Sequence, residues 1–556
     1  IKKRIDGEAV EALADGTVST QELRKIPLPP PPIIKKRFDS VEMQRSLASE
    51  PKVLDLPLLT VMVDFDDVAT ENDFSDLIWG QGKSLANYFN SMSGGQLRLV
   101  PAADNDGDGI VKVHLNRNHP SCGSDCSYGI NGVLAQALVQ ADDYLDFSQY
   151  DLNGDGTLTP DELAVQFIFA GNEAATSGNP KQSIWGHTWT MPAVNLDGTR
   201  LESYSALGEK QWGHRATLGV LAHQLGHLLL GLPDLYQDDP DHAGDIGQWG
   251  LMGTGSWNMT PQDHFMGDTP AALSAWSKSY LGLLTPKALV ESGNYDVATG
   301  EVQKIYLDPY LRGQQQGDYL LLDVRDRSGY DSALPDQGLL VTQVSQSGAE
   351  TVSTVQLLAD DAVLPGSQQQ RNLRLATAQG LPSDVYLSAI SDPASQMRFS
   401  LNLDGGLKGA LLGHYYQGQH QEVSGSLQWQ GQAPQATSRL EGIDLYAPKA
   451  GSYSLKVQGG SDSRALSWHL QPGWHRLMLD QPLSIRAGFD LQLAGPALAV
   501  EPGTQAPAGQ VLAGQGEAAQ LSLLLGQEAP QTTDNQQSDS QSGAGFGRWL
   551  LQVLGG

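Results

Sequence analysis

The stretch Leu221–Tyr236 reads LAHQLGHLLLGLPDLY, and it decides how the rest of the chain is interpreted. Its two histidines, His223 and His227, are four residues apart within an apolar run. Residues i and i+4 of a helix lie on one face, and two imidazoles on one face can hold one zinc ion. The pattern therefore predicts a zinc-binding helix. The alternative is a buried amphipathic helix with two incidental histidines, which leaves their paired spacing unexplained.

The residues after this helix supply its end and a third candidate ligand. Gly231 is typical of the position just past a helix end, and Pro233 of the positions beyond it. Asp234 comes after this turn, where its carboxylate can reach back toward a metal held by the two histidines.

One residue of the helix is wrong for an active hydrolase. In the zinc peptidase motif H-E-x-x-H, the glutamate beside the first histidine acts as the general base. Here that position is Gln224. An amide is nearly isosteric with a carboxylate and can hydrogen-bond water, but it accepts no proton at neutral pH. The sequence predicts a metal site without its base, whether Gln224 is an engineered change or a natural one.

Length and charge limit the classes of protein to consider. The chain has 556 residues, too many for one core, so we expect three or more domains. With 35 Lys+Arg against 63 Asp+Glu, the net charge is −28. So acidic a surface disfavours nucleic acid and anionic membranes and suits a secreted, calcium-binding protein. We expect no membrane span, and no signal peptide is visible in this numbering.

The pattern of elements changes along the chain. Helices and apolar strands mix at first, with strands expected at Leu58–Phe65 and Leu163–Ala170, and short alternating runs dominate after about 290. We therefore expect a multidomain chain with an α/β (α+β) catalytic domain followed by β-sandwich domains. The expected division is a pro-segment with a Pro-rich linker or a flexible leader (1–54), the catalytic domain (55–290), a β-sandwich (291–405), a second β-rich domain (406–502) and a disordered tail (503–556).

The two cysteines, Cys122 and Cys126, stand in the run CGSDC. A small disulfide loop is the favoured interpretation, because no second cysteine pair exists to complete a four-thiolate zinc site. Two free thiols or half a metal site are the alternatives.

A 12-residue stretch matches a calcium-binding loop. Residues 151–162 read DLNGDGTLTPDE, with a sharp-turn glycine at the sixth position. We expect an EF-hand-like calcium loop within another fold, or else an acidic turn; its candidate ligands are Asp151, Asn153, Asp155, Thr157 and Glu162. A possible second calcium site comprises Asp104, Asp106 and Asp108. It lacks a distal glutamate, and a solvated loop explains these residues equally well.

With these motifs identified, the chain resembles the secreted bacterial zinc peptidases of the immune inhibitor A type. The resemblance covers about 55–290 and rests on LPLLTVMVDF, SLANYFNSMSGGQLRL, DLNGDG, IWGH, the histidine helix with GLPDLY, WGLMGTGSW and PAALSAWSKSYLGLLTP. It implies a metzincin-like fold with Met252 as the Met-turn beneath the zinc. It also implies that His223, His227 and Asp234 are the zinc ligands.

The sequence departs from this family at two points. Gln224 replaces the glutamate, and one extra leucine precedes Gly231, which rotates the later residues of the motif by about 100°. Asp234 then needs a bulge or a longer turn to reach the metal. Should it fail, the fallback ligands are Asp238, Asp239, Asp241 and His242. His187 and His214 line the cleft or have structural roles.

Three functions compete. The first is an endopeptidase that acts on protein or peptide substrates, impaired by its missing base. The second is a non-catalytic binding protein that retains the peptidase fold. The third is a calcium-dependent adhesin, for which the segment GALLGHYY at Gly409–Tyr416 offers a faint resemblance to carbohydrate-binding β-sandwiches. Cell-surface glycans are therefore candidate partners of the C-terminal β domains.

Overall fold

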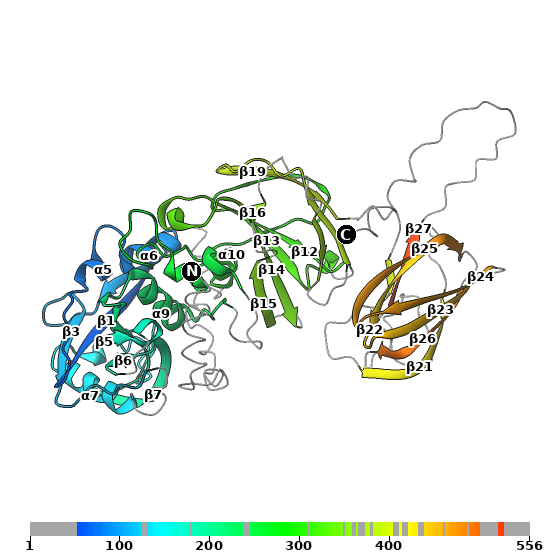
Figure 1. Cartoon of the computed structure of the whole chain (residues 1–556). Helices are drawn as coiled ribbons and strands as arrows, with labels where there is room; N and C mark the ends of the chain where they lie inside the picture. Colours follow the sequence, from blue (N-terminus) through cyan, green and yellow to red (C-terminus); the bar gives the residue numbers. More distant parts are fainter. Residues whose placement is uncertain are drawn as a thin grey trace.

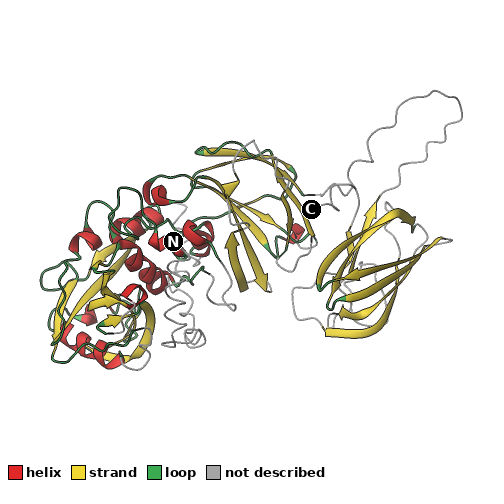
Figure 2. Cartoon of the chain, viewed as in Figure 1, coloured by secondary structure: helices red, strands yellow, loops and turns green. Residues whose placement is uncertain are grey.

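The structure of the chain is a computed structural model that describes residues 53–123, 130–177, 181–236, 245–309, 312–347, 351–357, 363–364, 373–377, 382–403, 411–413, 421–431, 439–459, 462–485, 489–500 and 521–526. Most of the expected pro-segment (1–54) and most of the expected C-terminal tail lie outside these ranges, and Leu54 already belongs to the first strand. Figure 1 shows three units in chain order, and Figure 2 shows that most helices belong to the first of them. Within the described ranges, no helix has the length and apolar character needed to cross a bilayer.

The first unit is built on a nine-stranded mixed sheet. Its centre is three parallel strands, β1 (Leu54–Phe65), β5 (Ala164–Glu173) and β8 (Thr199–Gln211). These strands are buried along most of their length, as expected of parallel strands covered on both faces. The other strands are β2 (Leu97–Pro101), β3 (Ile110–Leu115), β4 (Thr157–Leu158), β6 (Ser183–Ile184), β9 (His214–Arg215) and β7 (His187–Leu196), which pairs antiparallel with β8.

Side chains alternate along these strands into two cores. On one face, Leu58 and Ile168 pack with α6 (Leu85–Met92) and α9 (Leu218–Leu230). On the other face, Val61 and Phe167 pack with α7 (Asn131–Ala141). Shorter helices complete the unit: α5 (Ser75–Trp79), α8 (Ala174–Ser177), α10 (Ala275–Tyr280), η1 (Phe147–Tyr150), η2 (Gly247–Trp249) and η3 (Thr254–Trp257).

The second unit has two sheets. One holds β10 (Lys287–Ala288), β12 (Val302–Tyr306), β13 (Tyr319–Arg325), β14 (Gly338–Ser347), β15 (Thr351–Leu357) and β16 (Val363–Leu364). The other holds β11 (Gly293–Ala298), β17 (Leu373–Ala376), β18 (Pro382–Ser388) and β19 (Gln396–Asn402), and the helices are η4 (Arg312–Gln314) and η5 (Gly329–Ala333).

Strand β13 explains how this unit is attached to the first. Every residue of β13 is buried, because the two faces of the strand serve different cores. Leu320 and Leu322 point between the two sheets of their own unit. Tyr319 and Leu321 join the core that contains α9. The second unit is therefore packed continuously onto the first.

The third unit also has two four-stranded sheets around one core. The first is β20 (Leu411–Gly413), β27 (Leu521–Gly526), β22 (Arg439–Ala447) and β25 (Gly473–Ser484). The second is β21 (Gln421–Gly431), β26 (Phe489–Val500), β23 (Gly451–Gly459) and β24 (Asp462–Leu470).

Strand β27 corrects one expectation. It lies within 503–556, which we expected to be a disordered tail, yet it pairs with β22 along Leu521–Gly526. Its sequence LSLLLG is short but apolar, and the partner strand is distant in sequence. Composition averaged over a polar tail hides so short a strand.

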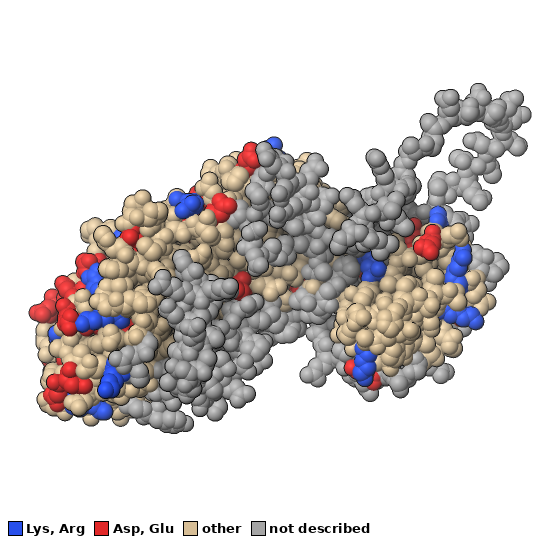
Figure 3. Space-filling view, in the orientation of Figure 1, with Lys and Arg blue, Asp and Glu red and all other residues tan. Residues whose placement is uncertain are grey.

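Charge is distributed unevenly over the surface. In the face shown in Figure 3, acidic side chains gather toward the free end of the first unit. This fits the net charge of −28.

Candidate metal centre

The histidine helix lies at the centre of the first unit. Helix α9 is buried at every residue except His227, which is half-buried, so its apolar character continues around its whole circumference. Gly226, between the two histidines, leaves room for a neighbouring side chain, because a Cβ added at this position would lie 2.8 Å from Met252 Sδ. The fully buried Met252 thus lies directly against the helix at the level of the histidines.

The helix ends in a turn wider than usual. Gly231 adopts the left-handed conformation at φ 57°, and its N–H points at the carbonyls of both Gly226 and His227. The N–H of Leu232 also donates to the Gly226 carbonyl, at 3.2 Å. Hydrogen bonds that span five and six residues form a looser turn than the four-residue spacing of an α-helix. This turn takes up the extra leucine before Gly231.

The wide turn returns Asp234 to the two histidines. Asp234 Oδ1 lies 3.1 Å from His223 Nε2 and 3.2 Å from His227 Nε2. The two Nε2 atoms are 3.1 Å apart. Among the described residues, these three side chains form the one group of three or more His, Cys, Asp or Glu arranged to hold a metal ion.

Each histidine is oriented by a main-chain carbonyl. His223 Nδ1 lies 3.1 Å from the Leu251 carbonyl, and His227 Nδ1 lies 2.6 Å from the Leu232 carbonyl. A carbonyl only accepts hydrogen bonds, so each Nδ1 carries a proton, and Nε2 is the nitrogen left to bind a metal ion. This is the usual second contact of a metal-binding histidine.

The donor set fits zinc. Ligand atoms about 2.0–2.1 Å from a tetrahedral zinc are about 3.3 Å from one another, close to the separations found here. Asp234 Oδ1 is buried and, within the described part of the chain, has no polar neighbour to bond beyond the two imidazoles. Burial alone would raise the pKa of Asp234, but the two histidines hold it well below its usual range.

Gln224 lies on the side of α9 that faces strand β7. Thr188 Oγ1, at the start of β7, donates to the main-chain carbonyl of Gln224 at 2.9 Å and lies 3.2 Å from its Oε1. On the other side is Gly186, where an added Cβ would lie 3.5 Å from Gln224 Nε2 and 3.3 Å from Glu173 Oε2. The amide and a buried carboxylate therefore border the same small space.

Glu173 was not among the site residues predicted from the sequence. It is 1% exposed at the end of β5 and accepts N–H groups from Gly186 at 2.8 Å and Gly208 at 3.1 Å. Burial raises its pKa to about 7, while those N–H groups lower it. The sequence signal for it is an acid three residues after the apolar run FIFA, at the end of a buried strand, where a carboxylate needs hydrogen-bond partners.

The other histidines considered from sequence lie outside the cluster. His187 Nδ1 bonds the Trp185 carbonyl at 2.7 Å and its Nε2 bonds the Tyr204 hydroxyl at 3.0 Å, so both ring nitrogens are engaged. His214 stacks on Phe265 with ring centroids 3.7 Å apart. The fallback ligands Asp238, Asp239, Asp241 and His242 lie outside the described residues.

The acid loops, both of which the structure describes, contain no second cluster of this kind. In residues 151–162, Glu162 is 1% exposed and accepts the Thr159 N–H at 3.1 Å, while Asp151 accepts the Gly156 N–H at 2.9 Å. In the other loop, Asp104 accepts the Gly107 N–H at 2.7 Å. Calcium at either loop stays a prediction. Cys122 is disulfide-bonded, and its predicted partner Cys126 lies outside the described residues.

Comparison with known proteins agrees with the first unit. Residues 65–285 match the family profile described as the catalytic domain of immune inhibitor A peptidase M6, which confirms the resemblance inferred from sequence. The chain is 30% identical over 151 residues to immune inhibitor A of Bacillus thuringiensis subsp. alesti, covering 24% of this chain and 21% of that protein. It is 29% identical over 153 residues to the pre-pro-metalloprotease PrtV of Vibrio cholerae serotype O1, covering 25% of this chain and 16% of that protein.

The matched segment is a small part of these relatives, about a fifth of their length or less. Among solved structures, OgpA from Akkermansia muciniphila aligns over 86% of this chain and 96% of its own, with 12% identity and a TM-score of 0.25.

Proposed function

We propose that the chain is a zinc metallopeptidase-type protein whose centre binds zinc and whose hydrolysis of protein substrates is strongly impaired by Gln224. The observation that carries the proposal is the triangle of His223 Nε2, His227 Nε2 and Asp234 Oδ1, with sides of 3.1, 3.1 and 3.2 Å. The matching catalytic-domain profile over 65–285 supports the same reaction class.

The roles of the residues are derived from their chemistry. His223, His227 and Asp234 would hold the metal, while the carbonyls of Leu251 and Leu232 fix the two imidazoles. Zinc in such a set acts as a Lewis acid and activates water for attack on a carbonyl carbon. Gln224 can orient water by hydrogen bonding, but its amide takes no proton from it. Loss of a general base reduces turnover by about 100- to 10,000-fold.

A second candidate function is a binding protein that retains the peptidase fold without catalysis. It is favoured by the surroundings of Gln224, whose amide lies beside Thr188 on one side and near the carboxylate of Glu173 on the other. Such surroundings suit an amide at least as well as a second carboxylate.

The finer assignments extend this proposal. We assign a metzincin-like fold to the first unit, with Met252 as the Met-turn, because Met252 Sδ packs against α9 at Gly226. The paired sheets of the second and third units are assigned as β-sandwiches, because each pair encloses one apolar core. An extracellular location, calcium at residues 151–162 and glycan contacts of the third unit belong to the proposal as well.

Metal content and activity test the proposal separately. The purified chain is expected to retain one zinc per molecule after gel filtration, and Asp234→Ala should lose it far more readily than Asp238→Ala or Asp241→Ala. On a denatured protein substrate the chain should show little turnover, and Gln224→Glu should gain it. Robust, chelator-sensitive turnover by the unaltered chain would overturn the impairment. Zinc binding without any gain in Gln224→Glu would favour the binding protein.

A further inference from the structure

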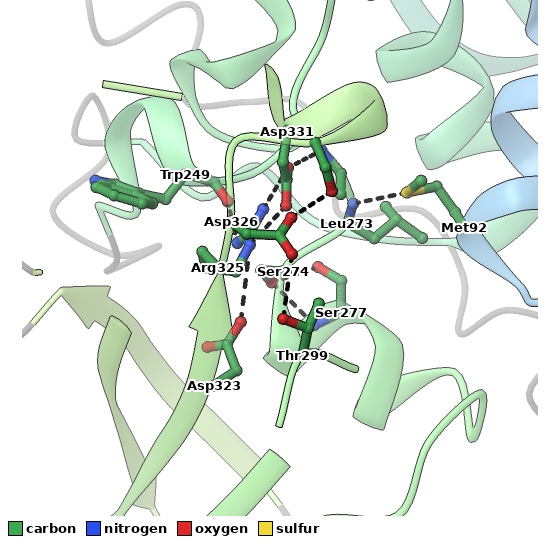
Figure 4. Close-up of polar contacts among 12 residues, drawn as sticks. Met92, Trp249, Leu273, Ser274, Ser277, Thr299, Asp323, Arg325, Asp326 and Asp331 are labelled. Carbon is green, nitrogen blue, oxygen red and sulfur yellow. Dashed lines mark hydrogen bonds and ion pairs between the residues drawn. The ribbon is translucent and has the colours of Figure 1, made fainter. Parts of the chain in front are cut away.

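A buried ion pair joins the second unit to the first (Figure 4). Arg325, the last residue of β13, is 5% exposed and donates two hydrogen bonds to Asp331, at 2.8 Å from Nε and 2.7 Å from Nη2. Its Nη1 donates to the main-chain carbonyl of Trp249 at 2.7 Å. Asp331 also accepts the main-chain N–H of Ala272 at 2.9 Å. One ion pair of the second unit thus holds two separate segments of the first.

These two segments pair with each other beside the metal centre. The N–H of Leu251 donates to the carbonyl of Ala272 at 3.3 Å, between the two points that the ion pair holds. The carbonyl of the same Leu251 is the acceptor for His223 Nδ1, at 3.1 Å. A continuous series of hydrogen bonds therefore runs from Arg325 and Asp331 to the first metal-ligand histidine.

The same segment also reaches the third ligand. The carbonyl of Met252 accepts the N–H of Leu235 at 2.7 Å, and Leu235 is the residue directly after Asp234. The segment from Trp249 to Met252 thus contacts His223 directly and Asp234 through the residue that follows it. Trp249 itself packs with Leu334 and Leu340 of the second unit.

The charges at this junction favour a fixed arrangement. Burial would lower the pKa of Arg325, but Asp331 and Asp323 raise it above its usual range, so it remains charged. Burial raises the pKa of Asp323 to about 6, which Arg325 partly offsets. A guanidinium that makes three directed hydrogen bonds in a planar fork has no equivalent in lysine.

We infer that Arg325 is a positioning residue for the metal centre. Arg325 holds the segment Trp249–Met252, and this segment holds His223 and Asp234 in the geometry that binds zinc. The inference rests on the proposed zinc function and adds that the second unit is part of the metal-binding machinery. The family profile ends at residue 285, so Arg325 and Asp331 lie beyond the matched segment. The first unit alone would therefore lack the hydrogen bonds that Arg325 and Asp331 make to it.

The test compares Arg325→Lys and Arg325→Met with the unaltered full chain. The zinc dissociation constant is measured by chelator competition, and the cobalt-substituted protein gives a visible spectrum that reports ligand geometry. Removing an outer partner of a metal ligand typically weakens binding about 10- to 100-fold. We expect about 10-fold weaker zinc binding and altered cobalt bands in both variants.

Two matched controls separate positioning from general loss of stability. Arg476→Lys alters a buried bidentate pair in the third unit, where Arg476 bonds both oxygens of Asp444 at 2.7 Å. Tyr330→Phe removes a hydrogen bond at the same junction, from the Tyr330 hydroxyl to the Ser84 carbonyl at 3.2 Å, which involves no residue of the segment Trp249–Met252. Both should lower the melting temperature and leave the zinc dissociation constant and cobalt bands unchanged.

The outcomes distinguish the two proposals. If the unaltered chain binds no zinc, the proposed function fails. If it binds zinc and Arg325→Lys matches Tyr330→Phe in affinity and spectrum, Arg325 is a structural residue only and the inference is overturned. Should Arg325→Met not fold, Arg325→Lys carries the comparison, because it keeps the charge and loses only the fork.

Discussion

Gln224 Nε2 and Glu173 Oε2 border the same space, each within 3.5 Å of the point where a Cβ on Gly186 would lie. The carboxylate is buried, and its remaining contacts are with main-chain N–H groups rather than with a cation. An amide donor beside it is compatible with its charge. A second carboxylate would be repelled by it in a low-dielectric environment.

This proximity predicts that Gln224→Glu is less stable than the unaltered chain at pH 8, where Glu173 is mostly charged. A decrease in melting temperature of several degrees is expected, since each kcal/mol shifts a domain of this size by about 2–4 °C. In the double variant Glu173→Gln, Gln224→Glu, the decrease should largely disappear. A thermal-shift double-mutant cycle measures the coupling, and additive effects of the two substitutions would contradict it.

The titration of Glu173 predicts a pH dependence of stability. Its pKa rises from its ordinary value of 4.5 to about 7 on folding, so the folded state binds more protons than the unfolded state between these values. The unfolding free energy should therefore fall as the pH rises from 4.5 to 7, by about 3 kcal/mol from this group. Glu173→Gln should remove this slope. Denaturant unfolding at pH 5 and pH 8 checks it, and a difference between the two chains that does not vary with pH would contradict it.

Gly226 predicts a steric test of the metal centre. In Gly226→Ala the new methyl group would meet Met252 Sδ at 2.8 Å, so the sulfur or the helix must move. We expect weaker zinc binding and a loss of about 1–3 kcal/mol of stability. The control is Gly132→Ala on α7, where an added Cβ meets nothing within 4 Å. It should stabilise by about 0.5–1 kcal/mol, because alanine is the better helix former. If both substitutions behave alike, Met252 does not restrain the helix.

The sequence predicted the elements that depend on local pattern. The apolar runs at β1 and β5 form buried strands, and the paired histidines lie on a helix that ends at Gly231. Spacing alone left open whether Asp234 could reach them, because the extra leucine is absorbed by hydrogen bonds that span five and six residues. The turn also lies against Met252, which packs at Gly226 and accepts the Leu235 N–H, and no local pattern encodes these contacts.

Contacts between residues distant in sequence could not be predicted in this way. Glu173 meets Gly186 and Gly208 only after β5, β7 and β8 are assembled in one sheet. From the sequence, Arg325 is a charged residue at the end of a strand, where solvent exposure is expected. In the structure it is 5% exposed, because β13 packs on the first unit. Pairing of β27 with β22 likewise joins two segments that are distant in sequence, which composition does not reveal.

The loop at residues 151–162 predicts that calcium stabilises the first unit rather than switching its conformation. It leads into β5, a buried strand of the central sheet, not into a mobile pair of helices. A ligand that binds only the folded state raises stability by mass action, so removal of calcium should lower the melting temperature and increase proteolysis, while zinc occupancy persists in the folded fraction.

Glu162→Gln separates calcium binding from the structural role of this side chain. Glu162 accepts the N–H and the hydroxyl of Thr159, at 3.1 and 2.8 Å, so the substitution has its own effect without calcium. The informative quantity is therefore the increase in melting temperature on adding calcium. It should be large in the unaltered chain and small in Glu162→Gln, because the amide removes the bidentate carboxylate that a calcium loop provides at its twelfth position. If calcium leaves the melting temperature of the unaltered chain unchanged while zinc stays bound, residues 151–162 form an acidic turn and no calcium site.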